Sequence, residues 1–397
     1  MLTREKLAQA TQLVAASDAD VWLTFVRETA LGSDPVLPLI LEGGLTWHSA
    51  LMVGRGGAKV AVVGNYDADP LIASGDWDRV VPYVQGVGPD LLRELESLVA
   101  PGGKIAINYS TSNEKADGIT HGMFLLLSDI LRGTRFDGSL VSAEGIVGAL
   151  RGQKTSAECL RMREAIAETD RMFADIAAFA RVGVTERAVY DHVHRLARER
   201  GLGFSWDPVG DPIVNSGPDS MIGHGIPSDT IKIAPGHIFH IDLGLLKDDY
   251  ASDIQRCWYV PEPGETSPPE DVLDALEAVN AAISAGAERL APGVEGWTVD
   301  AAARETLVAR GYPEYLHALG HQVGRAAHDG GALLGPKWDR YGNLPTTPVK
   351  EREVYTLELG ITVPGRGYLG LEEMVQVTAN GIEWLSHRQL EMPLLGK

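Results

Sequence analysis

The chain has 397 residues, of which 44% are hydrophobic and 22% charged, and its formal net charge is −19. This length is enough for two or three domains with separate cores, and the negative charge argues against nucleic acid or an anionic membrane as a partner. The two cysteines, Cys159 and Cys257, give no disulfide framework. The sequence begins without the apolar core of a signal peptide and contains no apolar run of about 18 residues, so we expect a cytoplasmic protein.

The first part of the chain, residues 1–152, is typical of a separate α/β domain. A helix is expected through Val14, with Thr3 as its N-cap. Three strands should follow at Val21–Val26, Ala58–Gly64 and Lys104–Tyr109. The loop glycines lack phosphate-loop spacing, and Trp47 and His48 are expected in a core or an interface.

A polar stretch at residues 151–154 predicts the boundary between domains 1–152 and 153–397. Thr155 and Glu158 then form a capping-box signature. Apolar and small side chains recur behind it at steps of three and four, which predicts a long amphipathic helix. The stripe consists of Cys159, Met162, Ile166, Thr169, Phe173, Ile176 and Ala180.

Helix signals recur later in the chain at the same spacing. A second helix should start after Gly183 and end at Gly201, and a later one should start after Gly293 and end at Gly311. A helix start at residues 267–270 precedes this later helix, as the long helix precedes the earlier one. We interpret the pattern as an internal duplication of two helices followed by a hairpin. The alternative is a coincidence of helix lengths.

The first hairpin is expected at residues 238–245 and 251–260. Its flanks are apolar on both faces, yet it contains Asp242 and Asp253. A two-residue turn at Lys247 and Asp248 would place the two carboxylates directly opposite each other, where like charges repel. Buried carboxylates must be paired or bound to metal, so a divalent cation is expected.

The second hairpin is expected at Tyr355–Val363 and Tyr368–Thr378. Glu358 and Glu372 are centred on Gly365 and therefore can face each other. Two divalent cations would neutralise the four carboxylates. The alternative is a pair of solvated acidic contacts, which the apolar flanks disfavour.

Three histidines lie in glycine-containing segments between these elements, namely His224, His321 and His328. Gly320 and Gly324 flank His321 and permit close backbone approach, as a metal ligand needs. One imidazole with four carboxylates favours Mn²⁺, with Co²⁺, Zn²⁺ or Fe²⁺ as alternatives. A hydrogen-bonded loop or core histidine is the competing interpretation.

Together these motifs resemble the pita-bread metallopeptidase family, M24, which includes methionine aminopeptidase, aminopeptidase P and prolidase. The resemblance is carried by IDLG with Asp242, YASD with Asp253, GHQVG with His321, LELG with Glu358 and EEMVQVT with Glu372. It implies an α+β protein, whose C-terminal pita-bread catalytic domain has an internal pseudo-twofold duplication. A smaller α/β domain, similar to the creatinase N-terminal domain in position and size, would precede it.

The resemblance also implies roles for these side chains. Asp242 would chelate one metal ion and His321 the other. Glu358 would share the second ion and shuttle a proton, while Asp253 and Glu372 would bridge both. A metal-bridging hydroxide would attack the scissile carbonyl. His224 and His328 match the two further histidines of the family and would stabilise the tetrahedral intermediate.

Chain length and the additional N-terminal domain resemble the proline-specific branch, so the implied activity is hydrolysis of the imide bond in Xaa-Pro dipeptides, as in prolidase. Aminopeptidase P, which acts on longer peptides, is the alternative. The family arginine two residues before the last glutamate is Gly370 here, the usual HExP is HDGG, and Gln255 replaces a threonine. Arg366 and Arg325 are candidates to bind the substrate carboxylate instead.

Two further alternatives use the same fold. One is a metal-dependent sulfoniopropionate lyase, which the five ligands alone do not exclude. The other is a catalytically silent binding module, which the retained ligands disfavour. By analogy with the family we expect a homodimer, in which the N-terminal domain of one subunit shapes the other's active site.

Overall fold

The computed structural model describes residues 2–32, 34–223 and 225–396. The chain divides into two compact units, residues 1–151 and 152–397. In the described part of the chain, no helix combines the length and the apolar character that crossing a bilayer requires.

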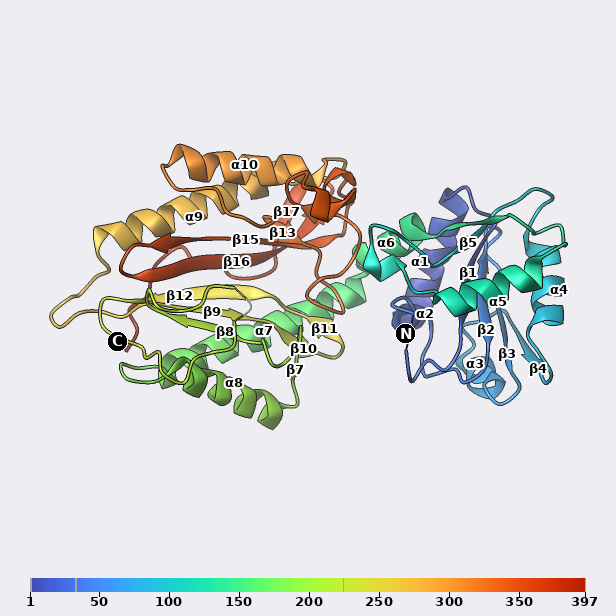
Figure 1. The fold of residues 1–397 in the computed structure, drawn as a ribbon, viewed down its shortest axis with the longest axis horizontal. Helices are drawn as coiled ribbons and strands as arrows, with labels where there is room; N and C mark the ends of the chain where they lie inside the picture. The colour runs from blue at the N-terminus through green and yellow to red at the C-terminus, as the bar shows by residue number, and fades with distance from the viewer. Residues whose placement is uncertain (1, 33, 224, 397) are drawn as a thin grey trace. The chain divides into compact units, whose positions relative to one another are not determined.

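The first unit is a mixed sheet with helices on both faces (Figure 1). Its strands are β1 (Val21–Val26), β2 (Ser49–Gly54), β3 (Lys59–Gly64), β4 (Arg79–Tyr83), β5 (Ile105–Ile107) and β6 (Leu140–Ser142), in the order β4-β3-β2-β1-β5-β6. Its helices are α1 (Leu2–Ala16), α2 (Leu37–Ile40), α3 (Ala68–Ser74), α4 (Gly88–Leu98), α5 (His121–Leu131) and α6 (Glu144–Gly152), with a 3₁₀ turn at Glu114–Ala116.

Successive side chains along each strand point to opposite faces of the sheet, so the first unit has two hydrophobic cores. Trp22 of β1 packs in a core with α1, α2 and α6, whereas Leu23 packs in a second core with α4 and α5. Strand side chains that alternate between two apolar layers are expected for a sheet covered on both faces. The three predicted strands are therefore confirmed within two residues of their ends.

The predicted N-cap of α1 and a core position for Trp47 are both wrong. Thr3 is not the N-cap of α1, because the helix already includes Leu2 and the Thr3 hydroxyl donates to Glu42 Oε1 at 3.2 Å. Trp47 is not a core residue, since it is 53% exposed. An interface role for Trp47 stays a prediction.

The second unit is built on a six-stranded sheet in which the path β15-β16-β12-β9-β8 is extended by β17 pairing with β16. The strands of the whole unit are β7 (Gly203–Phe204), β8 (Ile213–Ser216), β9 (Ile238–Leu243), β10 (Leu245–Lys247), β11 (Tyr250–Ala251), β12 (Ile254–Tyr259), β13 (Gly320–His321), β14 (Leu333–Leu334), β15 (Val354–Val363), β16 (Gly367–Thr378) and β17 (Gly381–Trp384). Strands β11, β10 and β7 form a separate three-stranded sheet, and β13 pairs with β14. Its helices are α7 (Ser156–Phe179), α8 (Glu186–Arg200), α9 (Glu270–Arg289) and α10 (Gly296–Ala309), with 3₁₀ turns at Asp339–Tyr341 and Leu344–Thr346.

The four helices pack in two pairs against the strands of this unit. Helices α9 and α10 contact each other, and α9 packs on β15 and β16. Helices α7 and α8 also contact each other and pack on β10, β11 and β8 (Figure 1). The predicted capping box of Thr155 and Glu158 is present at the start of α7, and every residue of the predicted stripe is buried.

The second helix of each pair, α8 or α10, is flanked by glycines at equivalent positions, as the proposed duplication requires. Gly183 and Gly293 precede α8 and α10 with φ of 91° and 85°, and Gly201 and Gly311 follow them with φ of 67° and 87°. Such left-handed backbone favours glycine. The two equivalent glycine positions thus have a left-handed backbone in both halves.

Strand register is confirmed for one hairpin and wrong for the other. Glu358 pairs directly with Glu372 across β15 and β16, as predicted. Asp242, however, pairs with Gln255 and not with Asp253. The cause is the turn, which is formed by Asp248 and Asp249 with φ of 47° and 65°, one residue later than expected. Two left-handed residues match the twist of a tight hairpin, and aspartate tolerates this conformation.

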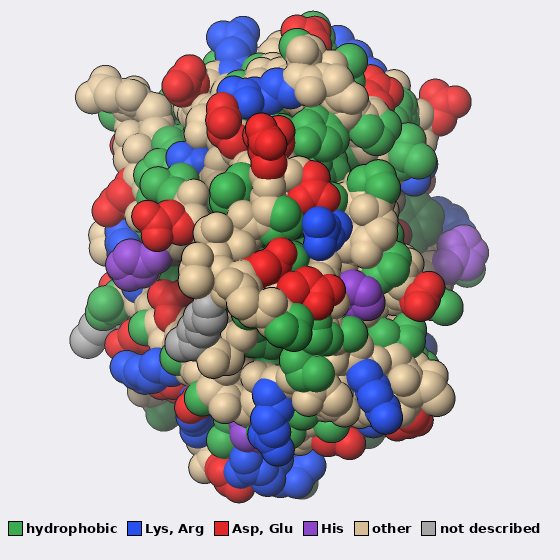
Figure 2. All heavy atoms as spheres, turned by 90° about the vertical axis from the view of Figure 1, so that its left-hand side faces the viewer, with side chains coloured by type: hydrophobic (Ala, Val, Ile, Leu, Met, Phe, Trp, Pro, Cys, Tyr) green, Lys and Arg blue, Asp and Glu red, His purple; other side chains and the backbone are tan. Residues whose placement is uncertain are grey.

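The excess negative charge does not form a continuous patch on the face shown in Figure 2. Acidic side chains are scattered there among basic, apolar and other polar groups. This distribution is that of a solvated surface.

Candidate metal centre

A row of polar side chains crosses the central strands of the second unit. Asp242 on β9 pairs with Gln255 on β12, Gln255 pairs with Glu372 on β16, and Glu372 pairs with Glu358 on β15. Residues paired across neighbouring strands point to the same face of a sheet. Both hairpins therefore deliver carboxylates to one line, with the amide of Gln255 between them.

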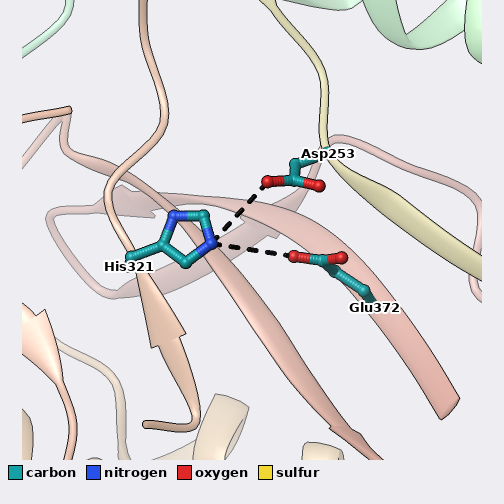
Figure 3. A group of neighbouring side chains, drawn as sticks. All are labelled: Asp253, His321 and Glu372. Carbon is teal, nitrogen blue, oxygen red and sulfur yellow. Dashed lines mark ion pairs between the residues drawn. The ribbon is translucent and has the colours of Figure 1, made fainter. Parts of the chain in front are cut away.

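Asp253, His321 and Glu372 form the compact part of the site. Each offers a ligand atom, and the three atoms lie within 4.8 Å of one another. Both carboxylates point toward the imidazole in Figure 3. His321 Nε2 lies 3.7 Å from Asp253 Oδ2, 4.0 Å from Glu372 Oε1 and 3.5 Å from Glu358 Oε1. Four predicted ligands therefore surround one small volume.

His321, on β13, is held beside β15 by hydrogen bonds of its backbone N–H and of its imidazole. Its N–H donates to Thr356 Oγ1 at 3.1 Å. Gly320 permits this approach, because a Cβ at that position would lie 2.0 Å from the Thr356 carbonyl oxygen. His321 Nδ1 lies 3.4 Å from the Gln322 carbonyl oxygen, which can only accept a proton. The lone pair of Nε2 therefore faces the carboxylates, as in metal-binding histidines.

Arg256 clamps the strands behind this face. Its Nη1 donates to the carbonyl oxygens of Gln255 at 2.8 Å and Glu372 at 3.0 Å, and its Nη2 pairs with Glu373 Oε2 at 3.0 Å. The guanidinium is therefore used to fix β12 against β16. It is not available to bind a substrate in the site.

Burial and crowding make all four carboxylates hard to ionise. Burial raises the pKa of Asp242 to about 7. Burial, and then repulsion by Asp242, raise the pKa of Glu358 to about 8. The pKa values of Asp253 and Glu372 are also raised, first by burial and then by neighbouring carboxylates. Without a cation, the ionised cluster is therefore strongly disfavoured.

The pKa of His321 is lowered, whereas the pKa values of the four carboxyl groups are raised. Burial and the neighbouring His328 lower the pKa of His321 to about 3. A neutral imidazole is the form that binds metal. Three carboxyl groups that need positive charge thus lie beside a base that is ready to coordinate a cation.

Two buried oxygen atoms test whether this donor set fits a metal. Within the described part of the chain, no hydrogen-bond donor reaches Asp242 Oδ1 or Glu372 Oε1. Buried polar atoms are nearly always satisfied, so orphaned carboxylate oxygens call for a ligand. Carboxylate oxygens with one imidazole suit divalent cations. The residues present therefore fit a divalent metal site.

Asp242 and His328 lie outside the compact group of Asp253, His321 and Glu372. Asp242 is near enough to raise the pKa values of Asp253, Glu358 and Glu372. The His328 ring lies edge-on to His321, with centroids 4.3 Å apart. His224 lies outside the described residues, so its role stays a prediction.

Three polar residues of this region were not assigned a role from the sequence. Gln255 donates to both glutamates, fully buried His240 contacts Gln255, and buried Asp211 raises the pKa of Asp253 by charge repulsion. The signal for two of them was present. His240 precedes Asp242 by two positions and Gln255 follows Asp253 by two, so period-two alternation places each pair on one strand face.

The two arginines considered for the substrate carboxylate have other partners. Arg366 Nε pairs with Asp271 at 3.0 Å, and its Nη1 donates to the Tyr259 hydroxyl at 3.2 Å. Arg325 Nη2 pairs with Asp249 at 3.1 Å. Arg366 therefore braces the β15–β16 turn. Arg325 would have to leave its partner to bind a substrate.

Comparison with known proteins supplies the context for this site. The family model of metallopeptidase family M24 matches residues 160–379, more than half of the chain. The Xaa-Pro dipeptidase of Pyrococcus furiosus is 32% identical over 252 residues, which are 63% of this chain and 67% of that protein.

Solved structures resemble the chain over nearly its whole length. The dipeptidase PepE of Mycobacterium ulcerans superposes with a TM-score of 0.74 at 25% identity, covering 99% of this chain and 98% of the other. The X-Pro aminopeptidase of Thermotoga maritima superposes with a TM-score of 0.69 at 23% identity, covering 98% and 99%. The second likeness is one of fold alone.

Proposed function

The chain belongs to metallopeptidase family M24, and on that premise we propose that it hydrolyses the imide bond of Xaa-Pro dipeptides, as a prolidase does. The observation that carries the proposal is the convergence of Asp253, His321 and Glu372 on one small volume, beside buried carboxylate oxygens without a donor. Relatives named Xaa-Pro dipeptidase support the substrate class. The substrate is then a small peptide with proline in second position.

The enzyme uses divalent metal ions, and we propose Mn²⁺ as the native metal because the donor set is rich in oxygen. Asp242 would hold one ion, His321 and Glu358 the other, and Asp253 and Glu372 both. When bound, two such ions polarise a carbonyl and make a water nucleophile accessible near neutral pH. Co²⁺ or Zn²⁺ are the alternatives.

Two side chains of the site are suited to act on the substrate. Glu358 has a pKa of about 8 when no cation is present, and its Oε1 lies on the His321 side of the cluster. It would take a proton from the attacking water and return it to the leaving proline nitrogen. His328, edge-on to His321, would donate to the carbonyl oxygen as negative charge develops there. We propose the same role for His224.

A direct test combines metal reconstitution with two substrates. Apo-protein is loaded with Mn²⁺, Co²⁺ or Zn²⁺ and offered an Xaa-Pro dipeptide beside an Xaa-Pro-Yaa tripeptide. Metal-dependent cleavage of the dipeptide alone is the expected result. If neither peptide is cleaved while two ions are bound, the metal centre stands and the peptidase proposal fails.

Aminopeptidase P activity on longer peptides is the second candidate, because the two arginines considered for a dipeptide's carboxylate are already ion-paired. Longer substrates place that carboxylate away from the metals. Cleavage of the tripeptide alone would select this alternative. Arg325→Ala and Arg366→Ala test the first candidate: an unchanged dipeptide KM in both would remove them as carboxylate-binding groups.

We also propose that residues 1–152 form a creatinase-like N-terminal domain, that the enzyme is a cytoplasmic homodimer, and that this domain completes the partner's active site. Half-exposed Trp47 and the neighbouring His48 are candidates for that contact. A monomeric mass by light scattering at micromolar concentration would contradict the dimer.

A further inference from the structure

Gln255 is the hydrogen-bond donor shared by two of the proposed metal ligands. Its Nε2 donates to Glu358 Oε2 at 3.1 Å and to Glu372 Oε2 at 3.1 Å. The opposite oxygens, Oε1 of each glutamate, face His321 Nε2 at 3.5 and 4.0 Å. In each glutamate, one carboxylate oxygen therefore accepts a hydrogen bond from the Gln255 amide, and the other points toward the proposed metal site.

The orientation of this amide is itself fixed. Gln255 Oε1 lies 3.1 Å from His240 Nε2, and His240 Nδ1 lies 3.0 Å from Asn215 Oδ1. Asn215 in turn donates from Nδ2 to the Met221 carbonyl oxygen at 2.9 Å. If the Gln255 amide were turned over, its oxygen would face two carboxylates. The two carboxylates thus favour the orientation with Nε2 toward them. Gln255 Oε1 can then accept a hydrogen bond from His240 when the neutral imidazole carries its proton on Nε2, in which case Nδ1 does not donate to Asn215.

Gly370 provides the space for this arrangement. A Cβ at that position would lie 2.6 Å from Gln255 Oε1 and 2.9 Å from His240 Nε2. Both distances are below those of ordinary contacts between carbon and polar atoms. The same Cβ would lie 2.5 Å from Tyr368 Cε1, so any larger residue there would displace the Tyr368 ring, the amide or the imidazole. Gly370 and the Gln255–His240 pair are therefore packed as one unit.

We propose that Gln255 is a positioning residue for metal binding: oriented by His240, it fixes the carboxylates of Glu358 and Glu372 so that their Oε1 atoms converge with His321. Gln255 acts through the glutamates and does not contact substrate. Partners that orient metal ligands typically contribute about 10- to 100-fold in metal affinity. The inference rests on the proposed metal centre.

The experiment compares Gln255→Leu with wild type. Leucine keeps the approximate volume but cannot donate to the glutamates. Metal dissociation constants and stoichiometry are measured by equilibrium dialysis with Mn²⁺, and the electronic spectrum is recorded after loading with Co²⁺. We expect about 10- to 100-fold weaker binding of at least one ion and altered d–d bands. At saturating metal, kcat should fall while KM stays near the wild-type value.

Gln376→Leu is the matched control. Gln376 lies on the same strand as Glu372 but donates to Cys159 Sγ at 3.1 Å, away from the carboxylates. Its loss should leave metal affinity and the Co²⁺ spectrum unchanged. His240→Phe retains Gln255 and removes its polar support, so it should reproduce part of the Gln255→Leu effect even if the latter variant folds poorly.

The outcomes separate this inference from the proposed function. Wild-type metal affinity and spectrum in a folded Gln255→Leu or His240→Phe variant would overturn the positioning role. A wild-type protein that binds no divalent ion would overturn the metal centre first. A wild type that binds two ions without cleaving either peptide would leave the positioning role testable by affinity alone.

Discussion

Glu358 lies directly opposite Glu372 in the antiparallel pair β15–β16, and both glutamates accept a hydrogen bond from Gln255. Facing carboxylates normally repel each other. Their coexistence here, in a buried row, implies either bound protons or bound cations. Because either protons or cations can neutralise the cluster, the stability of the protein should depend on pH and on the concentration of divalent metal.

In the metal-free protein, the free energy of unfolding should decrease as pH rises. The folded apo-protein holds protons on Glu358 and Asp242, whose pKa values are about 8 and about 7 against ordinary values of 4.5 and 3.8. Because the folded state binds more protons, this contribution is complete below about pH 4 and is lost as pH rises through 7 to 8. Urea unfolding of chelated protein at about pH 5 and about pH 8 should show a lower free energy of unfolding at the higher pH. Loading with Mn²⁺ should reverse the loss, and equal values at both pH would contradict it.

Neutralising Glu372, a proposed bridging ligand, should weaken metal binding at the centre. Glu372→Gln keeps the shape of the side chain but removes the charge and places an NH₂ group near Asp253. We expect loss of at least one bound ion, measured by elemental analysis, and loss of peptidase activity. Glu383→Gln is the control, because Glu383 forms an exposed pair with Arg163 that contributes little. Two ions bound to Glu372→Gln would remove Glu372 from the ligand set.

His328→Ala should separate chemistry from metal binding. The ring is beside His321, yet its proposed role is to donate to the developing oxyanion and not to coordinate. Loss of one such donor typically costs about 10²–10³ in kcat. We expect this decrease with metal content unchanged. A variant that loses metal in parallel with activity would instead identify His328 as a ligand or its support.

Asp300 should be essential for stability although it lies outside the metal centre. It accepts from Arg304 Nε at 2.9 Å, from the Leu319 N–H at 3.1 Å and from the Tyr315 hydroxyl at 3.2 Å, and it is 1% exposed. Asp300→Ala leaves the buried Arg304 unpaired, which typically costs about 3–5 kcal/mol. Thermal unfolding should show this loss. A change below about 1 kcal/mol would contradict it.

The double variant Asp300→Ala with Arg304→Met provides the check. It removes both charges, so the free energy of unfolding should recover toward the wild-type value. Failure to recover would show that the lost hydrogen bonds of Asp300 and Arg304 to Leu319, Tyr315 and His317, rather than an unpaired charge, cause the instability.

Much of the fold was accessible from the sequence. The expected α+β architecture, with a C-terminal pita-bread domain after a smaller α/β domain, is confirmed, as is the family. Helix α7 was predictable because its capping box and apolar stripe agree on one helix. The β15–β16 register was predictable because Gly365, with φ of 71°, fixes the turn.

The first hairpin shows where such reasoning fails. Both candidate turns contain Asp248, and the sequence does not reveal that Asp249 rather than Lys247 joins it in the left-handed conformation. A shift of one turn residue changes the pairing by two positions, which put Gln255 opposite Asp242. The shift preserves the strand faces, so the carboxylates were still expected on the correct side.

The contacts of Gln255 and His240 were not predictable for another reason. Side-chain hydrogen bonds between five strands depend on rotamers and on the space beside Gly370, which no period in one strand encodes. The sequence shows only that both residues share the ligand face. Their roles therefore had to come from coordinates, and the ligand roles of Asp242, Asp253, His321, Glu358 and Glu372 stay predictions.

The repeated architecture has a consequence for how the protein is made. Asp242 and Asp253 leave the ribosome with the first repeat, while Glu358 and Glu372 follow only with the last strands of the second. A nascent chain therefore exposes half of a binding site, and a metal ion can act only once both repeats have met. A bound ion would then link segments that are far apart in the sequence, and it would do so reversibly, after the two repeats have folded together.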